Sequence, residues 1–271
     1  MTAALIESPQ NARVKALMRL HQRRERDRTN TALCEGLQET AHALRSGVAI
    51  QALWLCPEWT SADAAELEGL AKRRDIPVWH LSPAAFKRIS VRQNPDGVAC
   101  TFTPPGASVD TLTESAQGLL LVLVGTEKPG NLGALVRSAD ALGAAGVLTV
   151  TGRGSDPWNA AAIRTSMGSV FNIPIASGPA EHVRSALSQQ GWSMVASSPA
   201  GHVSPWQMDW QGRVALVVGP EHEGLDTAWL DAADHTVRIP MEGGADSMNA
   251  SVSGAILLYE ALRHRTMSGA D

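Results

Sequence analysis

Apolar positions in the first hundred residues follow a helical spacing that alternates with short continuous runs. Val14, Leu17 and Met18 recur at intervals of three and four residues, which predicts an amphipathic helix that begins near Ser8 and Pro9. Further along, the same alternation predicts helices at 37–44, 62–74 and 83–89 and strands at 50–55, 77–80 and 98–102. It indicates a small α/β domain.

The second half of the chain has longer apolar runs. They predict strands at 119–124, 146–151, 192–197, 214–218 and 236–239, with helical spacing between most of them and a last helix at 249–264. Nearly continuous apolar strands separated by helices are typical of a parallel sheet that helices cover on both faces. We therefore expect an α/β fold here as well.

Length and composition indicate two globular domains. The chain has 271 residues, of which 44% are hydrophobic and 18% charged, which excludes a disordered or collagen-like chain. Domains typically run to about 150 residues, so two are expected. Pro104, Pro105 and Gly106 lie in a polar stretch between the halves, as is typical of a linker. The predicted division is a domain at 1–105, a linker at 106–117 and a domain at 118–271.

The sequence predicts neither a membrane span nor a disulfide framework. The longest apolar run, at 118–125, is far shorter than the roughly 20 residues that cross a bilayer. The first residues lack the basic and then apolar pattern of a secretory signal, so we expect a cytoplasmic protein. Cys34, Cys56 and Cys100 are far apart and have no C-x-x-C spacing. We expect them to be buried thiols.

Positive charge is concentrated near the N-terminus. Residues 11–28 contain seven basic and two acidic residues, a net charge of +5, which leaves −9 for the rest of a chain whose total is −4. Such a segment suits a nucleic-acid phosphate backbone, and it is equally consistent with the solvated face of a helix. The residues of this segment considered for phosphate contacts are Arg13, Lys15, Arg19, Arg23 and Arg24.

Two glycine-rich turns after predicted strands lack residues that nucleotide binding requires. Residues 125–130 have the glycine spacing of a P-loop, but Asn131 and Leu132 stand where a lysine and a serine or threonine are needed. Residues 152–154 begin a dinucleotide fingerprint, but Pro157 replaces its third glycine. The sequence therefore argues against an ATP-binding protein and a nicotinamide enzyme.

Metal-dependent and serine hydrolases are also disfavoured. His222 and Glu223 begin a zinc-protease motif, but Asp226 stands where the second histidine must be. The chain has no G-x-S-x-G nucleophile elbow. We expect no metal site.

Three segments of the second half form an ordered set. Residues 128–140 have the sequence KPGNLGALVRSAD, residues 217–225 have VVGPEHEGL, and residues 239–252 have IPMEGGADSMNASV. In this order and spacing they resemble the three signature motifs of the SpoU/TrmH family of RNA ribose 2′-O-methyltransferases, in the SPOUT superfamily. The resemblance covers most of residues 119–265.

The N-terminal half has a looser resemblance. Residues 8–11 (SPQN), Val14 with Lys15, and Glu35 with Gly36 are similar to the ribosomal-protein-like domain with which many members of this family bind RNA. This resemblance implies that residues 1–105 bind the RNA substrate.

The resemblance implies a fold and a cofactor. The fold is a parallel sheet whose C-terminal part forms a deep trefoil knot, which ordinary topology rules would exclude. The cofactor is S-adenosyl-L-methionine, and the family positions that hold it match Gly219, Ile239 and Met248, with Met241 nearby. Glycine lets a backbone approach a ligand, and the three larger side chains offer an apolar slot for adenine. Taken singly, each residue is more typical of a turn or a core.

The resemblance also assigns catalytic residues. The family's catalytic arginine matches Arg137, and its polar partners match Asn131, Glu221, Ser247 and Asn249. An arginine within a helix is otherwise most often part of a surface salt bridge. A guanidinium with a pKa above about 12 is a poor base. We therefore expect Arg137 to hold the adjacent phosphate and to stabilise negative charge that develops on the ribose oxygen.

This chain departs from the family pattern at two positions. Pro220 stands where the family usually has asparagine, and Met248 stands where it usually has leucine. Methionine for leucine nearly conserves volume, so the proline matters more, because it removes a side-chain hydrogen bond. Arg164 lies in a stretch, RTSMGS, that resembles a family segment beside the RNA site, and we expect it to contact phosphate.

Several alternatives stay open at this stage. We expect ribosomal RNA as the substrate, with a modification of the antibiotic-resistance type as one form of this activity. The alternatives are a transfer RNA substrate, methylation of a base, and a non-catalytic RNA- or ribosome-binding protein. The family also implies a homodimer through the knotted domain, to which the helix at 249–264 would contribute, and no membrane partner.

Overall fold

The chain forms two compact units. A computed structural model describes residues 5–152, 154, 156–221, 223–244 and 247–268. The N-terminal unit contains Met1–Pro105 and Trp158–Asn172, and the C-terminal unit contains Gly106–Pro157 and Ile173–Asp271. The segment Trp158–Asn172 therefore belongs to the N-terminal unit, although it lies in the second half of the sequence.

The N-terminal unit is built on a mixed four-stranded sheet. Its strands lie in the order β1 (Ala32–Glu35), β4 (Val98–Phe102), β2 (Ile50–Leu55) and β3 (Val78–His80). β4 is antiparallel to both neighbours, and β3 is parallel to β2. The helices of this unit are α1 (Ala12–Arg19), α2 (Arg23–Thr29), α3 (Leu37–Arg45), α4 (Ala62–Arg73), α5 (Pro83–Ile89), α8 (Ala160–Thr165) and the 3₁₀ helix η1 (Ser169–Phe171).

Buried side chains join these helices to the sheet. Leu17 of α1 and Phe86 of α5 pack in one cluster with Trp54 of β2. α8 lies against β1, and the ring of Phe171 in η1 meets the ring of Phe102 in β4 edge to face, with centroids 5.1 Å apart. These contacts explain why the segment that contains α8 and η1 belongs to this unit.

The basic N-terminal segment forms two helices, so the prediction of one amphipathic helix was wrong in its extent. Asn11 caps α1 by accepting a hydrogen bond from the backbone N–H of Arg13. A turn separates α1 from α2. The buried Arg26 guanidinium stabilises this turn by donating to the carbonyls of Leu20 (2.7 Å) and His21 (3.0 Å). One arginine of the segment therefore stabilises the fold.

The C-terminal unit contains a six-stranded, fully parallel sheet. Its strands lie in the order β10 (His235–Val237), β8 (Ser193–Ser197), β9 (Val214–Val218), β5 (Leu119–Leu123), β6 (Gly146–Val150) and β7 (Ile175–Gly178). Its helices are α6 (Val109–Ser115), α7 (Pro129–Ala141), α9 (Ala180–Gln189), α10 (Thr227–Ala232), α11 (Ala250–Ser268) and the 3₁₀ helix η2 (Pro205–Gln207). The predicted parallel sheet is confirmed.

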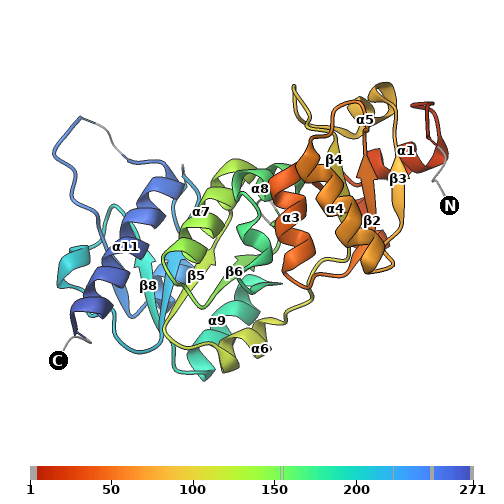
Figure 1. Ribbon diagram of the computed structural model, residues 1–271. Coiled ribbons are helices and arrows are strands. Elements are labelled where there is room, and N and C mark those ends of the chain that lie inside the picture. Colours follow the sequence, from red (N-terminus) through yellow and green to blue (C-terminus); the bar gives the residue numbers. More distant parts are fainter. Residues whose placement is uncertain (1–4, 153, 155, 222, 245–246, 269–271) are drawn as a thin grey trace. The chain divides into compact units, whose positions relative to one another are not determined.

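Helices cover both faces of this sheet (Figure 1). Leu112 of α6, Leu187 of α9 and Trp229 of α10 are buried in one cluster with strand residues such as Val122. α7 and α11 lie side by side on the other face. The α/β architecture is therefore as expected, and the knot that the family resemblance implies stays a prediction.

Further elements differ from the sequence expectations, and one of them is β1 (Ala32–Glu35), which was not predicted. Residues 106–117, expected to be a linker, contain α6, because Val109 and Leu112 are buried against the sheet. The strand β7 was not predicted, because its four residues include Ser177 and Gly178 and form no apolar run. A short strand at a sheet edge needs only one partner, here β6.

The expected properties of the cysteines are confirmed. Cys34, Cys56 and Cys100 are free and buried, and burial raises the pKa of the Cys34 thiol well above its ordinary value. Within the described residues, no helix is long and apolar enough to cross a membrane.

Candidate active site

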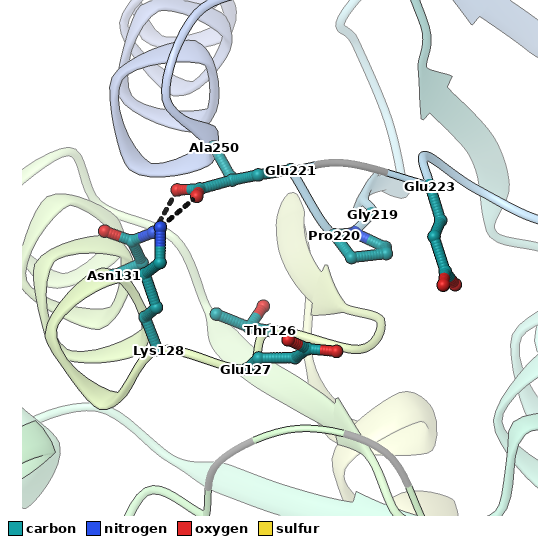
Figure 2. Close-up of a pocket in the computed structure, with 9 residues that line it drawn as sticks. All are labelled: Thr126, Glu127, Lys128, Asn131, Gly219, Pro220, Glu221, Glu223 and Ala250. Carbon is teal, nitrogen blue, oxygen red and sulfur yellow. Dashed lines mark hydrogen bonds and ion pairs between the residues drawn. The ribbon is translucent and has the colours of Figure 1, made fainter.

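Two adjoining pockets lie at the carboxyl ends of β5 and β9, where parallel sheets place their ligand sites. The first pocket, of about 160 Å³, is lined by Thr126, Glu127, Lys128, Asn131, Gly219, Pro220, Glu221, Glu223 and Ala250; Figure 2 shows these nine residues. The second pocket, of about 430 Å³, shares Gly219 to Glu221 with the first and extends to residues 238–248. Segments from all three sequence motifs therefore meet here.

Glu221 is the centre of the first pocket's hydrogen-bond network. The Asn249 amide donates to its Oε1 at 2.6 Å, and the Asn131 amide donates to the same oxygen. Lys128 Nζ donates to its Oε2 at 2.8 Å. Figure 2 shows Glu221 turned toward Lys128 and Asn131 and away from Glu223. One carboxylate thus ties the start of α7 to the start of α11.

The ion pair between Lys128 and Glu221 changes the pKa of both groups. The hydrogen bond from Lys128 lowers the pKa of Glu221 below its ordinary value, and Asn131 and the backbone N–H of Ala250 act in the same direction. The carboxylate in turn raises the pKa of Lys128. Both groups are therefore charged at neutral pH.

Local sequence explains how these side chains are positioned. Pro129 occupies the first turn of α7, where its missing N–H costs no helical hydrogen bond. Asn131 is the third residue of α7 and lies in the same turn. Asn249 precedes α11, where its Oδ1 accepts from the backbone N–H of Ser251 at 2.9 Å. The amide of Asn249 therefore caps a helix with its oxygen and binds Glu221 with its nitrogen.

The second pocket contains every residue that was expected to hold the cofactor: Gly219, Ile239, Met241 and Met248. It also contains Ser247, which was expected to be one of the polar catalytic partners. A Cβ on Gly219 would lie 2.9 Å from the backbone of Gly224, so only glycine fits this loop. The mixture of apolar side chains, tight backbone and carboxylates fits a cofactor with an adenine ring and a sulfonium cation.

Arg137 is placed apart from this network. It lies on α7 two turns after the Asn131 amide, its side chain is exposed, and it lines neither pocket. Within the described part of the chain it makes no hydrogen bond or ion pair. The structure therefore brings together Asn131, Glu221 and Asn249, and leaves Arg137 open to solvent.

The residues expected to contact RNA lie in the N-terminal unit. Those on α1 and α2, and Arg164 on α8, are all exposed: Arg13, Lys15, Arg19, Arg23, Arg24 and Arg164. The guanidinium of Arg13 lies 4.1 Å from the ring centroid of Trp79, and the guanidinium of Arg23 lies 3.6 Å from the Asp27 carboxylate. These contacts hold two of the six side chains at the surface.

The sequence analysis missed several residues of the first pocket, among them Lys128 and Thr126. Lys128 supplies the positive charge of the first pocket, and the hydroxyl of Thr126 is buried there without a hydrogen-bond partner among the described residues. Both lie between the end of β5 and the start of α7. That position is the signal that could have found them, because ligand sites of parallel sheets lie at the carboxyl ends of strands.

The described residues contain no cluster of three or more histidine, cysteine, aspartate and glutamate side chains that could hold a metal ion. His222, which begins the incomplete zinc-protease motif, lies outside the described residues.

Comparison with known proteins agrees with the geometry of the two pockets. Residues 118–259 match the SpoU rRNA Methylase family, and residues 11–100 match the MRM3-like substrate binding domain. RlmP of Bacillus subtilis, a 23S rRNA guanosine 2′-O-methyltransferase, is 29% identical over 94% of this chain and 97% of its own length.

Solved structures show the same relationship over nearly the whole chain. A crystal structure of an RNA 2′-O ribose methyltransferase has a TM-score of 0.84 at 39% identity and covers 97% of this chain and 100% of its own. An rRNA methyltransferase from Sinorhizobium meliloti, solved with bound AdoMet, has a TM-score of 0.87 at 31% identity and covers 97% and 98%. The chain therefore belongs to the SpoU rRNA methylase family.

Proposed function

We propose that this methyltransferase transfers a methyl group from S-adenosyl-L-methionine to a ribose 2′-hydroxyl of ribosomal RNA. The observation that supports this most directly is the network of Asn131, Glu221 and Asn249, which joins the first pocket to the pocket that fits the cofactor. Relatives over the whole length of the chain bear names with this activity.

The reaction is a direct displacement: the ribose oxygen bonds to the methyl carbon as the carbon–sulfur bond breaks, and the hydroxyl releases its proton. The protein must therefore align the oxygen, the carbon and the sulfur. S-adenosyl-L-methionine, when bound, supplies the methyl group. Gly219, Ile239, Met241 and Met248 would hold it in the second pocket. The first pocket then receives the ribose next to the methyl group, where Asn131 and Asn249 present amide groups that can hydrogen-bond a hydroxyl.

Arg137 is proposed to bind the RNA rather than to remove a proton. Its side chain is exposed and has no partner within the described residues, so a phosphate can reach both edges of the guanidinium. An arginine cannot act as a base near neutral pH, because its pKa exceeds about 12. Bound to a phosphate of the substrate, the guanidinium would hold the RNA in position for transfer.

The N-terminal unit is proposed to bind the RNA substrate, and residues 1–105 form its main part. The catalytic domain is proposed to be residues 118–271. The match of residues 11–100 to a substrate binding domain supports this, as do the exposed basic side chains of α1 and α2. Ribosomal RNA is found in the cytoplasm, and the expectation of a cytoplasmic protein stays a prediction.

The test is a nucleoside-level mass spectrum of RNA treated with the purified chain and S-adenosyl-L-methionine. An unmodified 23S rRNA transcript should gain one ribose-methylated nucleoside, and EDTA should not prevent it. A methylated base would refute the ribose assignment. Methylation of transfer RNA alone would refute the ribosomal substrate, and RNA binding without methyl transfer would leave a non-catalytic protein.

We further propose a homodimer that forms through α11. Val252, Ile256 and Tyr259 share one face of this helix and are 48%, 38% and 59% exposed, and Trp206 of η2 beside them is 59% exposed. Such a row of exposed apolar side chains is unusual on a monomer surface. Light scattering should give about 57 kDa, twice the 28.7 kDa of one chain. A value near 29 kDa for active protein would refute the dimer.

A further inference from the structure

Lys128 occupies a distinctive position in the first pocket. It immediately precedes α7, and its side chain is 65% exposed although Nζ lies 2.8 Å from Glu221 Oε2. The side chain therefore lines the pocket and is accessible to a ligand that enters it.

Glu221 does not depend on Lys128 for its position. Its Oε1 accepts from the amides of Asn131 and Asn249, and its carboxylate also accepts from the backbone N–H of Ala250. These donors belong to α7 and α11, which the core of the C-terminal unit holds in place. The carboxylate would keep its orientation if Lys128 turned away, and an exposed ion pair contributes little to folding.

Carboxylates outnumber cationic side chains among the nine residues that line the first pocket. Three carboxylates line it, those of Glu127, Glu221 and Glu223. Among the nine lining residues Lys128 is the one with a positive side chain. A ribose cannot enter without its adjoining phosphodiester, which the carboxylates would repel. The start of α7 offers further positive potential to such an anion.

We propose that Lys128 binds the RNA phosphate that adjoins the acceptor ribose, and that it exchanges Glu221 for this phosphate when RNA enters the pocket. This inference rests on the proposed function, since it takes the first pocket to be the ribose site. Lys128 then acts as a positioning residue: it fixes the nucleotide, while Asn131 and Asn249 keep Glu221 in place.

The cofactor is the other anionic candidate, because its methionine end has a carboxylate. The structure favours the phosphate, since Lys128 lines the first pocket and is absent from the lining of the second, which contains Gly219, Ile239, Met241 and Met248. The affinity for the cofactor therefore separates the two ligands.

The experiment compares Lys128→Ala with Arg184→Ala. Arg184 is the control, because it lies on α9 in the C-terminal unit, lines neither pocket, and its guanidinium lies 2.5 Å from the Glu181 carboxylate. With an unmodified 23S rRNA transcript, Lys128→Ala should weaken binding by about tenfold and lower the slope of log affinity against log salt by about one. Arg184→Ala should change neither. Calorimetry should give the same affinity for S-adenosyl-L-methionine in all three proteins.

A double variant distinguishes phosphate binding from mere neutralisation of Glu221. If Lys128 only cancels the carboxylate, then Lys128→Ala combined with Glu221→Gln restores wild-type RNA binding. If Lys128 contacts the phosphate, the double variant stays weaker than Glu221→Gln alone and keeps the reduced salt slope. Circular dichroism of each variant confirms that the fold is unchanged.

Three results would overturn the role of Lys128. They are wild-type RNA affinity in Lys128→Ala, full restoration in the double variant, and a loss of cofactor affinity in place of RNA affinity. Absence of methyl transfer by the wild-type chain would instead refute the proposed function, and the binding measurements would still decide whether Lys128 contacts RNA.

Discussion

Because Arg137 is exposed, its contribution to folding can be distinguished from its contribution to the reaction. Its side chain is open to solvent and has no hydrogen bond or ion pair within the described residues. Removal of such a side chain should have little effect on folding, because nothing is left buried or unpaired. Any effect of substitution can therefore be attributed to contact with substrate.

We expect Arg137→Ala to keep the melting temperature and the cofactor affinity of the wild type. Single-turnover methylation at saturating RNA should fall about 100-fold, the size expected when a substrate is no longer held in the geometry that the reaction needs. Arg137→Lys should recover part of the rate, since it restores the charge without the planar fork. Ordinary turnover by Arg137→Ala would remove this residue from the mechanism.

Glu221 should contribute to stability in a pH-dependent way. Its pKa is lowered in the folded protein, first by the hydrogen bond from Lys128. A lowered carboxyl pKa adds stability above the ordinary value of 4.5, and this stability is lost as the pH falls through the folded pKa. Urea unfolding should show Glu221→Gln less stable than wild type at pH 7, with the difference shrinking below pH 4.5 and disappearing once the pH is below the lowered pKa of the folded carboxyl. A difference that grows in acid would contradict this assignment.

At the scale of elements, α11 depends on Asn249 for its first turn. The Oδ1 of this residue accepts from the backbone N–H and the hydroxyl of Ser251, while its amide binds Glu221. Asn249→Ala should therefore reduce the free energy of unfolding by about 1 kcal/mol, as loss of a helix cap does.

Asn249→Ser is the matched control. Serine retains an oxygen that can cap α11 but lacks the amide that donates to Glu221. Denaturant unfolding should give this variant nearly wild-type stability, whereas the methylation rate should fall as it does in Asn249→Ala. If both variants lose stability equally, the cap is not the source of the effect.

The helices α1 and α2 should act on RNA binding alone. Arg23 and Arg24 are exposed at the start of α2, so Arg23→Ala combined with Arg24→Ala should weaken RNA binding broadly. The salt slope should fall by roughly one for each phosphate contact that is removed. Cofactor affinity, measured by calorimetry, should stay constant. An unchanged salt slope would mean that these side chains only solvate a helix face.

Elements with strong hydrophobic patterns were predictable from the sequence, and short or interrupted ones were not. The short, continuous apolar runs of β5 and β9 predicted buried strands. All of their residues are indeed buried. β7 is too short to show a pattern, and α6 was obscured by the prolines before it. The break after α1 depends on Arg26, whose burial no charge pattern indicates.

For the whole molecule, the arrangement of the site was predictable only in part. The family resemblance assigned Asn131, Glu221 and Asn249 to one site, and the structure brings their side chains together. Neither the ion pair of Lys128 with Glu221 nor the distance of Arg137 from both pockets follows from spacing, since each depends on how α7 is rotated over the sheet. The placement of α8 in the N-terminal unit likewise depends on the contact of Phe171 with Phe102.

The central claim concerns the whole molecule: the chain methylates a ribose of ribosomal RNA. The most direct measurement maps ribose methylation across all RNA from cells with and without the gene. We predict that one ribosomal 2′-O-methylated nucleotide is lost with the gene and returns with the wild-type chain but not with Arg137→Ala. Identical maps from both cell lines, or a change restricted to base methylation, would contradict the account.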